Sequence, residues 1–144
     1  MKYFTSEWWS TSGCYDEICK KYQEYYSSIS SQLPAELRTL EQEHTLHDSK
    51  IESIHYSYTN NTIRITLNGW DQELNNPIKY KLSFIDVISF NQSLLLEDNR
   101  FGDLGFWEYE IVETGIEMRM LFDSSAQITI VFNHFEFKSE PRKA

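Results

Sequence analysis

The residues best suited to chemistry are His47 and Asp48, the only histidine followed directly by an aspartate in this sequence. A carboxylate that orients an imidazole can make it a general base. Because His44 and His55 lie nearby in the sequence, the same pair also suggests a metal site. Zinc sites need three or four converging ligands, and this spacing matches no zinc signature. A metal-dependent enzyme centred on His47 and Asp48 therefore stays an alternative, and the sequence leaves open whether the four residues converge.

The same segment has a structural interpretation, which we favour. Leu46, His47 and Asp48 lie where the apolar residues change from helical spacing to strand-like alternation. Side chains that are adjacent in sequence tend to point apart, and an aspartate is well suited to holding backbone N–H groups at a turn. We therefore expect Leu46 to close the helix packing, and His47 and Asp48 to form hydrogen bonds at a junction between helices and sheet.

Other catalytic signatures are absent from the sequence. It has no Gly-rich phosphate loop, no Gly-x-Ser-x-Gly, no His-Glu-x-x-His and no Cys-x-x-Cys. The two cysteines, Cys14 and Cys19, lie five positions apart in a helical pattern, which places them on different helix faces and predicts that both are reduced. We expect no catalytic residue, no metal ligand and no cofactor, and thus a protein that is not an enzyme.

Acidic residues gather in the second half of the chain. From Glu97 to Asp123 there are eight acidic residues and only two basic ones, Arg100 and Arg119. A solvated sheet face is the ordinary explanation, but like charges on an open face repel, and a basic partner would relieve that repulsion. The predicted partner-binding residues are Glu97, Asp98, Asp103, Trp107, Glu108, Tyr109, Glu110, Glu113 and Glu117.

Helices are predicted in the first third of the chain. Apolar residues recur at intervals of three and four from Tyr15 to Leu33, which is typical of one buried helix face. Pro34 suits the first turn of a second helix that reaches Glu43, because its missing N–H costs nothing there. That second helix should turn Leu37 and Leu40 inward.

Antiparallel strands are predicted for the rest. Alternation and short turns indicate strands near Ile54–Tyr58 and at 62–67, 78–88, 106–113, 116–122 and 127–137, with loops at 68–77 and 91–105. Asp86 interrupts the alternation, which predicts a bulge between Phe84 and Ile88. The fold class is α+β: a helical segment (1–45) packs on a mostly antiparallel sheet of about six strands (46–138), in a single domain (1–144) with a frayed tail (139–144).

Charge narrows the class of partner. The 144 residues include 13 basic and 22 acidic ones, giving a net charge of −9. This argues against nucleic acid, whose binding proteins usually carry a basic stripe, and favours a basic protein partner. Glu7 interrupts the opening residues before a signal peptide can form, and no apolar run is long enough to span a membrane. We therefore expect a cytoplasmic protein.

Three segments carry a resemblance. Met1–Thr5, Leu33-Pro34 before a short helix, and Leu46–Ile51 before the sheet resemble a group of small uncharacterised bacterial proteins with a Leu- or Phe-His-Asp segment. The Leu-His-Asp pattern is also similar to that of some immunity proteins of bacterial polymorphic-toxin systems. The resemblance implies an antitoxin that binds and occludes a basic toxin, often a nuclease, without catalysis. A small regulatory module remains a further alternative, with the Tyr15–Tyr26 helix face exposed for docking.

Overall fold

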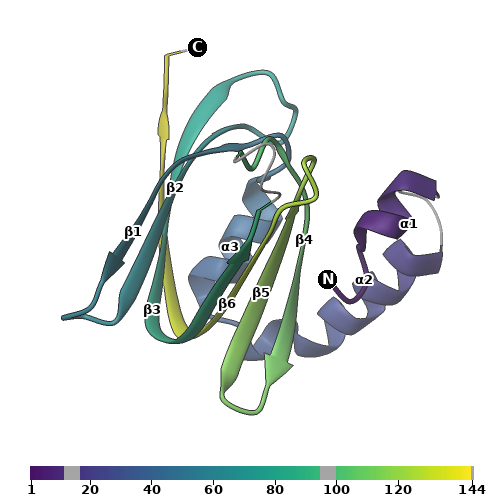
Figure 1. Cartoon of the computed structure of the whole chain (residues 1–144), viewed down its shortest axis with the longest axis horizontal. Coiled ribbons are helices and arrows are strands. Elements are labelled where there is room, and N and C mark those ends of the chain that lie inside the picture. The colour runs from purple at the N-terminus through teal and green to yellow at the C-terminus, as the bar shows by residue number, and fades with distance from the viewer. Residues whose placement is uncertain (12–16, 95–99, 144) are drawn as a thin grey trace.

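The computed structural model describes residues 1–11, 17–94 and 100–143 and shows a helical N-terminal region beside one sheet (Figure 1). The helices are α1 (Ser6–Thr11), α2 (Glu17–Ile29), the short 3₁₀ helix η1 (Ser30–Gln32) and α3 (Ala35–Glu43). The strands are β1 (Lys50–Ser57), β2 (Thr62–Trp70), β3 (Pro77–Ser93), β4 (Leu104–Val112), β5 (Gly115–Phe122) and β6 (Gln127–Pro141). The predicted α+β class is confirmed.

The six strands form one sheet in the order β1-β2-β3-β6-β5-β4, and every neighbouring pair is antiparallel. Its two edge strands meet at one end, where Lys50 and Asp103 form an isolated bridge. Next to this bridge, the backbone N–H of Asp48 donates to Leu104 O at 2.9 Å, and the N–H of Leu104 donates to Ser49 O at 2.8 Å. The segment that links helices to sheet therefore also ties the two sheet edges together.

Helix α3 covers one face of the sheet, which we call the inner face. It packs against β6, and α2 packs against β4, as Figure 1 shows with α3 behind the sheet and α2 leading away beside β4. Pro34 immediately precedes α3, and Leu37 and Leu40 are buried in the main core, as the apolar spacing predicts. Alternating residues of the central strands meet them there, including Ile63, Ile65, Leu67, Tyr80, Leu82, Phe84, Met118, Ile130 and Phe132.

A smaller aromatic cluster joins the N-terminal region to the edge of the sheet. Phe4, Trp8 and Tyr22 form its buried centre, and Phe106 of β4 packs against it. Phe4 stacks on Phe106 with ring centroids 5.3 Å apart. Because Tyr22 is buried in this cluster, the described part of the Tyr15–Tyr26 helix face is not the open aromatic patch that a docking module would need.

The strand β3 bends where the alternation breaks. Asp86 has a φ of 57°, and the pairing with β6 shifts between Val87 and Ser89. Aspartate tolerates this left-handed conformation better than most residues. The bulge predicted between Phe84 and Ile88 is thus present, and it lets apolar residues on both sides of Asp86 reach the core.

Several strands are longer than the sequence predicts, because β3 pairs over nearly its whole length with β6 and its first part also pairs with the end of β2. Strand β2 continues to Trp70 and β3 to Ser93, into regions predicted as loops. Residues 139–141, predicted as a frayed tail, pair with the start of β3, so that prediction was wrong. Beyond them, Arg142 donates to Gly69 O at 2.8 Å and lies over the ring of Trp70. Pairing of this kind satisfies backbone N–H and C=O groups and does not depend on the side chains, so polar residues at 139–141 can still form a strand.

The described helices are all too short or too polar to cross a membrane.

Candidate functional site

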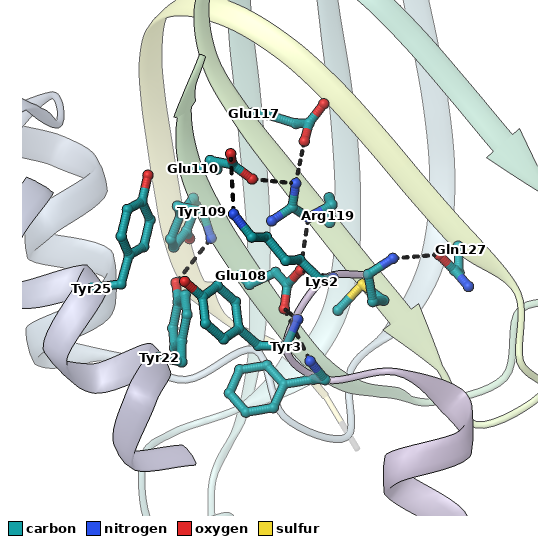
Figure 2. A network of polar contacts seen from close by, with 12 residues as sticks. Lys2, Tyr3, Tyr22, Tyr25, Glu108, Tyr109, Glu110, Glu117, Arg119 and Gln127 are labelled. Carbon is teal, nitrogen blue, oxygen red and sulfur yellow. Dashed lines mark hydrogen bonds and ion pairs between the residues drawn. The ribbon is translucent and has the colours of Figure 1, made fainter. Parts of the chain in front are cut away.

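The β4–β5 hairpin places its acidic side chains around one arginine. Glu108 lies opposite Arg119, and Glu110 lies opposite Glu117. Arg119 Nε donates to Glu108 Oε1 at 2.7 Å, while its Nη1 donates to Glu110 Oε1 at 2.8 Å and also to Glu117 (Figure 2). These carboxylates therefore share a cation that the chain itself supplies. Their mutual repulsion, which motivated the prediction of a basic partner, is largely compensated inside the molecule.

Glu108 is an interior residue of this network, with no exposed surface. Its carboxylate accepts hydrogen bonds from the backbone N–H groups of Lys2, Tyr3 and Phe4 (Figure 2). The N-terminal segment thus lies on the outer face of the hairpin, and Lys2 Nζ comes within 3.7 Å of Glu110 Oε2. The prediction that Glu108 contacts a partner was wrong, because the chain's own N-terminal segment covers it.

Tyr109 is also removed from the predicted surface, because its side chain points to the inner face and is fully buried. Its backbone N–H lies at the open edge of β4 and donates to Tyr22 Oη at 2.9 Å. Two residues along the strand, the N–H of Ile111 donates to Tyr25 Oη at 3.0 Å. Tyrosine hydroxyls of α2 thus take the place of a neighbouring strand and cover an edge that could otherwise pair with another chain.

The remaining predicted contacts do not form one surface. Asp103 is half-buried and binds Lys50 Nζ at 2.8 Å at the far end of β4. Glu113 is exposed in the turn at the other end of the hairpin. Glu97 and Asp98 lie outside the described residues. Asp103 lines one of the wider hollows near Lys50, and Trp107 lines a separate, smaller pocket; both are described below.

At the junction, Leu46 is buried in the core and His47 makes the key contact. His47 Nδ1 lies 3.1 Å from Gly105 O, and Nε2 lies 3.5 Å from Asp48 Oδ1. The sequence predicts that the Asp48 side chain accepts hydrogen bonds from backbone N–H groups. Among the described residues it accepts none, so this prediction was wrong. Instead its φ is 61°, a conformation that aspartate tolerates, and its own N–H donates to Leu104 O.

The four residues considered for a metal do not converge. His44 packs edge-on against the rings of Tyr80 and Phe137, with centroids 5.5 Å away in each case. His55 is exposed on β1. Within residues 1–11, 17–94 and 100–143, no group of three or more His, Cys, Asp or Glu side chains is placed to hold a metal ion.

A pocket of about 300 Å³ lies where the N-terminal segment, α2, α3 and the start of β4 meet. Two wider hollows of about 580 Å³ open near Lys50, but charged side chains that already have partners line them, including Lys50, Asp103 and Arg142. Half of the residues that line the smaller pocket are Phe, Tyr or Trp, and Gln23, Glu41 and His47 add polar groups, a combination that ligand sites often show. Its lining residues are Phe4, Tyr22, Gln23, Glu41, His47, Gly105, Phe106 and Trp107.

Glu41 is the charged group of this pocket. Its Oε1 accepts two hydrogen bonds, from Trp107 Nε1 and from Tyr109 Oη, each at 2.7 Å. Withdrawal of the carboxyl group from water raises its pKa, and the two hydrogen bonds offset part of that rise. No lysine, arginine or histidine of the described chain forms an ion pair with Glu41; Arg38, one helical turn earlier, does not reach it.

This arrangement can receive a cation. A carboxylate partly withdrawn from water, as that of the half-buried Glu41 is, gains stability from a proton or a positive charge beside it. The faces of aromatic rings attract cations as well, and tryptophan does so most strongly. The pocket therefore combines two features that select for a positively charged group.

Sequence reasoning missed Glu41, although one signal pointed to it. Glu41 lies four positions after Leu37 and directly after Leu40, so it falls on the apolar face of α3. A charged residue on that face must either reach solvent or find partners. His47 and Trp107, by contrast, were singled out from the sequence, and the structure brings both to the pocket.

Comparison with known proteins places the chain in a family. A search of curated proteins found no match. A family model described as "Protein of unknown function (DUF4085)" matches residues 4–132, which include the pocket, the junction and the acidic hairpin. That description assigns no activity, so the resemblance to immunity proteins stays a prediction. The chain belongs to the DUF4085 family.

Proposed function

We propose that this protein acts by binding, without catalysis, and that the Glu41 pocket receives a positively charged group of its partner. The observation that carries this proposal is the Glu41 carboxylate: it lies in an aromatic pocket with two hydrogen-bond donors and no cation from the described chain. Glu41 is half-buried, so withdrawing part of its carboxylate from water costs free energy, and a cation on a partner would offset that cost. Sites that bear this kind of cost are often functional.

In its most concrete form, the proposal is an immunity protein that occludes a basic toxin in the bacterial cytoplasm. The net charge of −9 would speed the encounter with a basic partner, and the resemblance at Leu46–Ile51 points the same way. The contact surface differs from the one that the sequence predicted. Trp107 keeps its role as an aromatic anchor, while Glu41 replaces Glu108 as the acidic group that meets the partner.

Binding to a basic toxin domain encoded by a neighbouring gene would test the proposal. The full chain and its Glu41→Gln variant would be titrated with that domain by calorimetry. Loss of a charge-assisted hydrogen bond at an interface should weaken binding roughly tenfold or more. Glu43→Gln is the matched control, because Glu43 is exposed at the end of the same helix. Equal affinity for both variants and the natural chain would refute the role of the pocket.

A further inference from the structure

We infer that the cation received by the Glu41 pocket is an alkylammonium group, such as the end of a lysine side chain, and not a guanidinium group. This inference rests on the function proposed above and names the chemistry of its ligand. The basis is a difference between the two carboxylate oxygens of Glu41: one accepts two hydrogen bonds from the described chain, and the other accepts none.

One carboxylate oxygen of Glu41 is already occupied. Oε1 accepts from Trp107 Nε1 and from Tyr109 Oη, both at 2.7 Å. A carboxylate oxygen offers about two lone-pair positions, so Oε1 has no acceptor capacity left. The described chain places no hydrogen-bond donor on Oε2. Both donors are side chains of β4, and releasing Oε1 would leave an indole N–H and a phenol O–H without this acceptor.

This occupancy discriminates between the two common cations of proteins. A guanidinium binds a carboxylate best side-on, with two parallel hydrogen bonds, one to each oxygen. Such a fork would require a third bond to Oε1 of Glu41. An ammonium is a compact point charge with three donors, and it needs only one oxygen. The single remaining oxygen of Glu41 therefore fits an ammonium.

Aromatic rings line the pocket beside Glu41 and are held in place by contacts of their own. Hydrogen bonding to Glu41 orients the indole of Trp107, and no other aromatic ring of the described residues stacks on it. Phe4 holds Phe106 by stacking, and the hydroxyl of Tyr22 is bound to the backbone of β4. These walls would attract either kind of cation. The choice between cations is made by the oxygens of Glu41.

The volume of the pocket limits the size of the ligand. About 300 Å³ is at the lower end of the range of small-molecule sites. It suits one short alkyl chain with its charged end. A lysine side chain, a compact positive charge on a flexible four-carbon stem, has this shape.

Three small probes of matched shape test the inference on the full chain. The probes are n-butylammonium, n-butylguanidinium and neutral n-butanol, titrated at pH 8, where histidine is mostly uncharged, with the indole N–H signal of Trp107 followed by NMR. We expect n-butylammonium to bind roughly tenfold more tightly than n-butanol and more tightly than n-butylguanidinium. Glu41→Gln should remove the preference for ammonium over butanol, whereas Glu43→Gln should keep it.

The outcomes separate this inference from the proposed function. If n-butylguanidinium binds as tightly as n-butylammonium or more tightly, the inference is wrong, but a cation-binding pocket remains. If neither cation binds better than n-butanol, both the inference and the pocket's proposed role are wrong. The comparison of the three probes on the natural chain needs no variant, so a folding defect in Glu41→Gln could not obscure it.

Discussion

Replacing Glu108 by alanine should strongly destabilise the protein, although the residue belongs to an acidic segment that the sequence assigns to the surface. The substitution removes the acceptor of Arg119 Nε and of three consecutive backbone N–H groups. Leaving one member of a buried ion pair unpartnered costs about 3–5 kcal/mol. Arg119 would keep Glu110 and Glu117, which favours the lower part of that range. The buried N–H of Phe4 adds about 1 kcal/mol.

We therefore expect the free energy of unfolding to fall by about 3–4 kcal/mol, a large part of the stability of a small domain. Urea unfolding followed by circular dichroism measures this change, and hydrogen exchange at Tyr3 and Phe4 should accelerate as the N-terminal segment loosens. Glu113→Ala is the matched control, because Glu113 is an exposed glutamate of the same hairpin and should change stability by less than about 0.5 kcal/mol. A loss below about 1 kcal/mol for Glu108→Ala, with an unchanged denaturant slope, would refute the reasoning.

Three further predictions follow from the other polar contacts. Partial burial raises the pKa of the Glu41 carboxyl above its ordinary value, so the natural chain loses stability as pH rises from that ordinary value through the raised one. The Glu41→Gln variant cannot ionise there, so its stability relative to the natural chain should be higher in urea melts at pH 8 than at pH 5; an equal difference at both pH values would contradict this. Asp48→Ala should lower stability by about 1 kcal/mol in thermal melts because of its φ of 61°, while Asp48→Gly should not; an equal loss in both would point to the side chain instead. Tyr25→Phe should lower stability by about 1 kcal/mol and speed hydrogen exchange at Ile111, and unchanged exchange would show that the tyrosine hydroxyl does not protect the edge.

Much of the fold could be read from local patterns. The alternation of Ile63 and Ile65 predicts a strand with one buried face, and both residues are fully buried. Helical spacing places Leu37 and Leu40 on the inner side of α3. The break in alternation at Asp86 predicts the bulge. These features could be predicted because the periods of strands and helices are properties of the backbone.

The candidate site could be predicted only in part. The unusual residue types at His47 and Trp107 drew attention in the sequence, and both line the pocket. The role of Glu41 could not be recognised from the sequence, because that role depends on Trp107 and Tyr109, which follow it by more than sixty positions in the chain. The lengths of β3 and β6 were underestimated for a similar reason, since their ends are held by pairing with each other.

By itself, the sequence determined which residues share a strand or helix face, the number of strands and the place where helices give way to sheet. Strand alternation correctly separates Glu108 from Tyr109 on opposite faces of β4. Only the tertiary structure decided what covers each face: the N-terminal segment lies over Glu108, and α2 and α3 lie over Tyr109. The physical reason is that burial and charge compensation depend on segments distant in sequence. A cluster of glutamates that looks exposed thus became an internal network around Arg119, and a single glutamate in a helix became the charged group of the pocket.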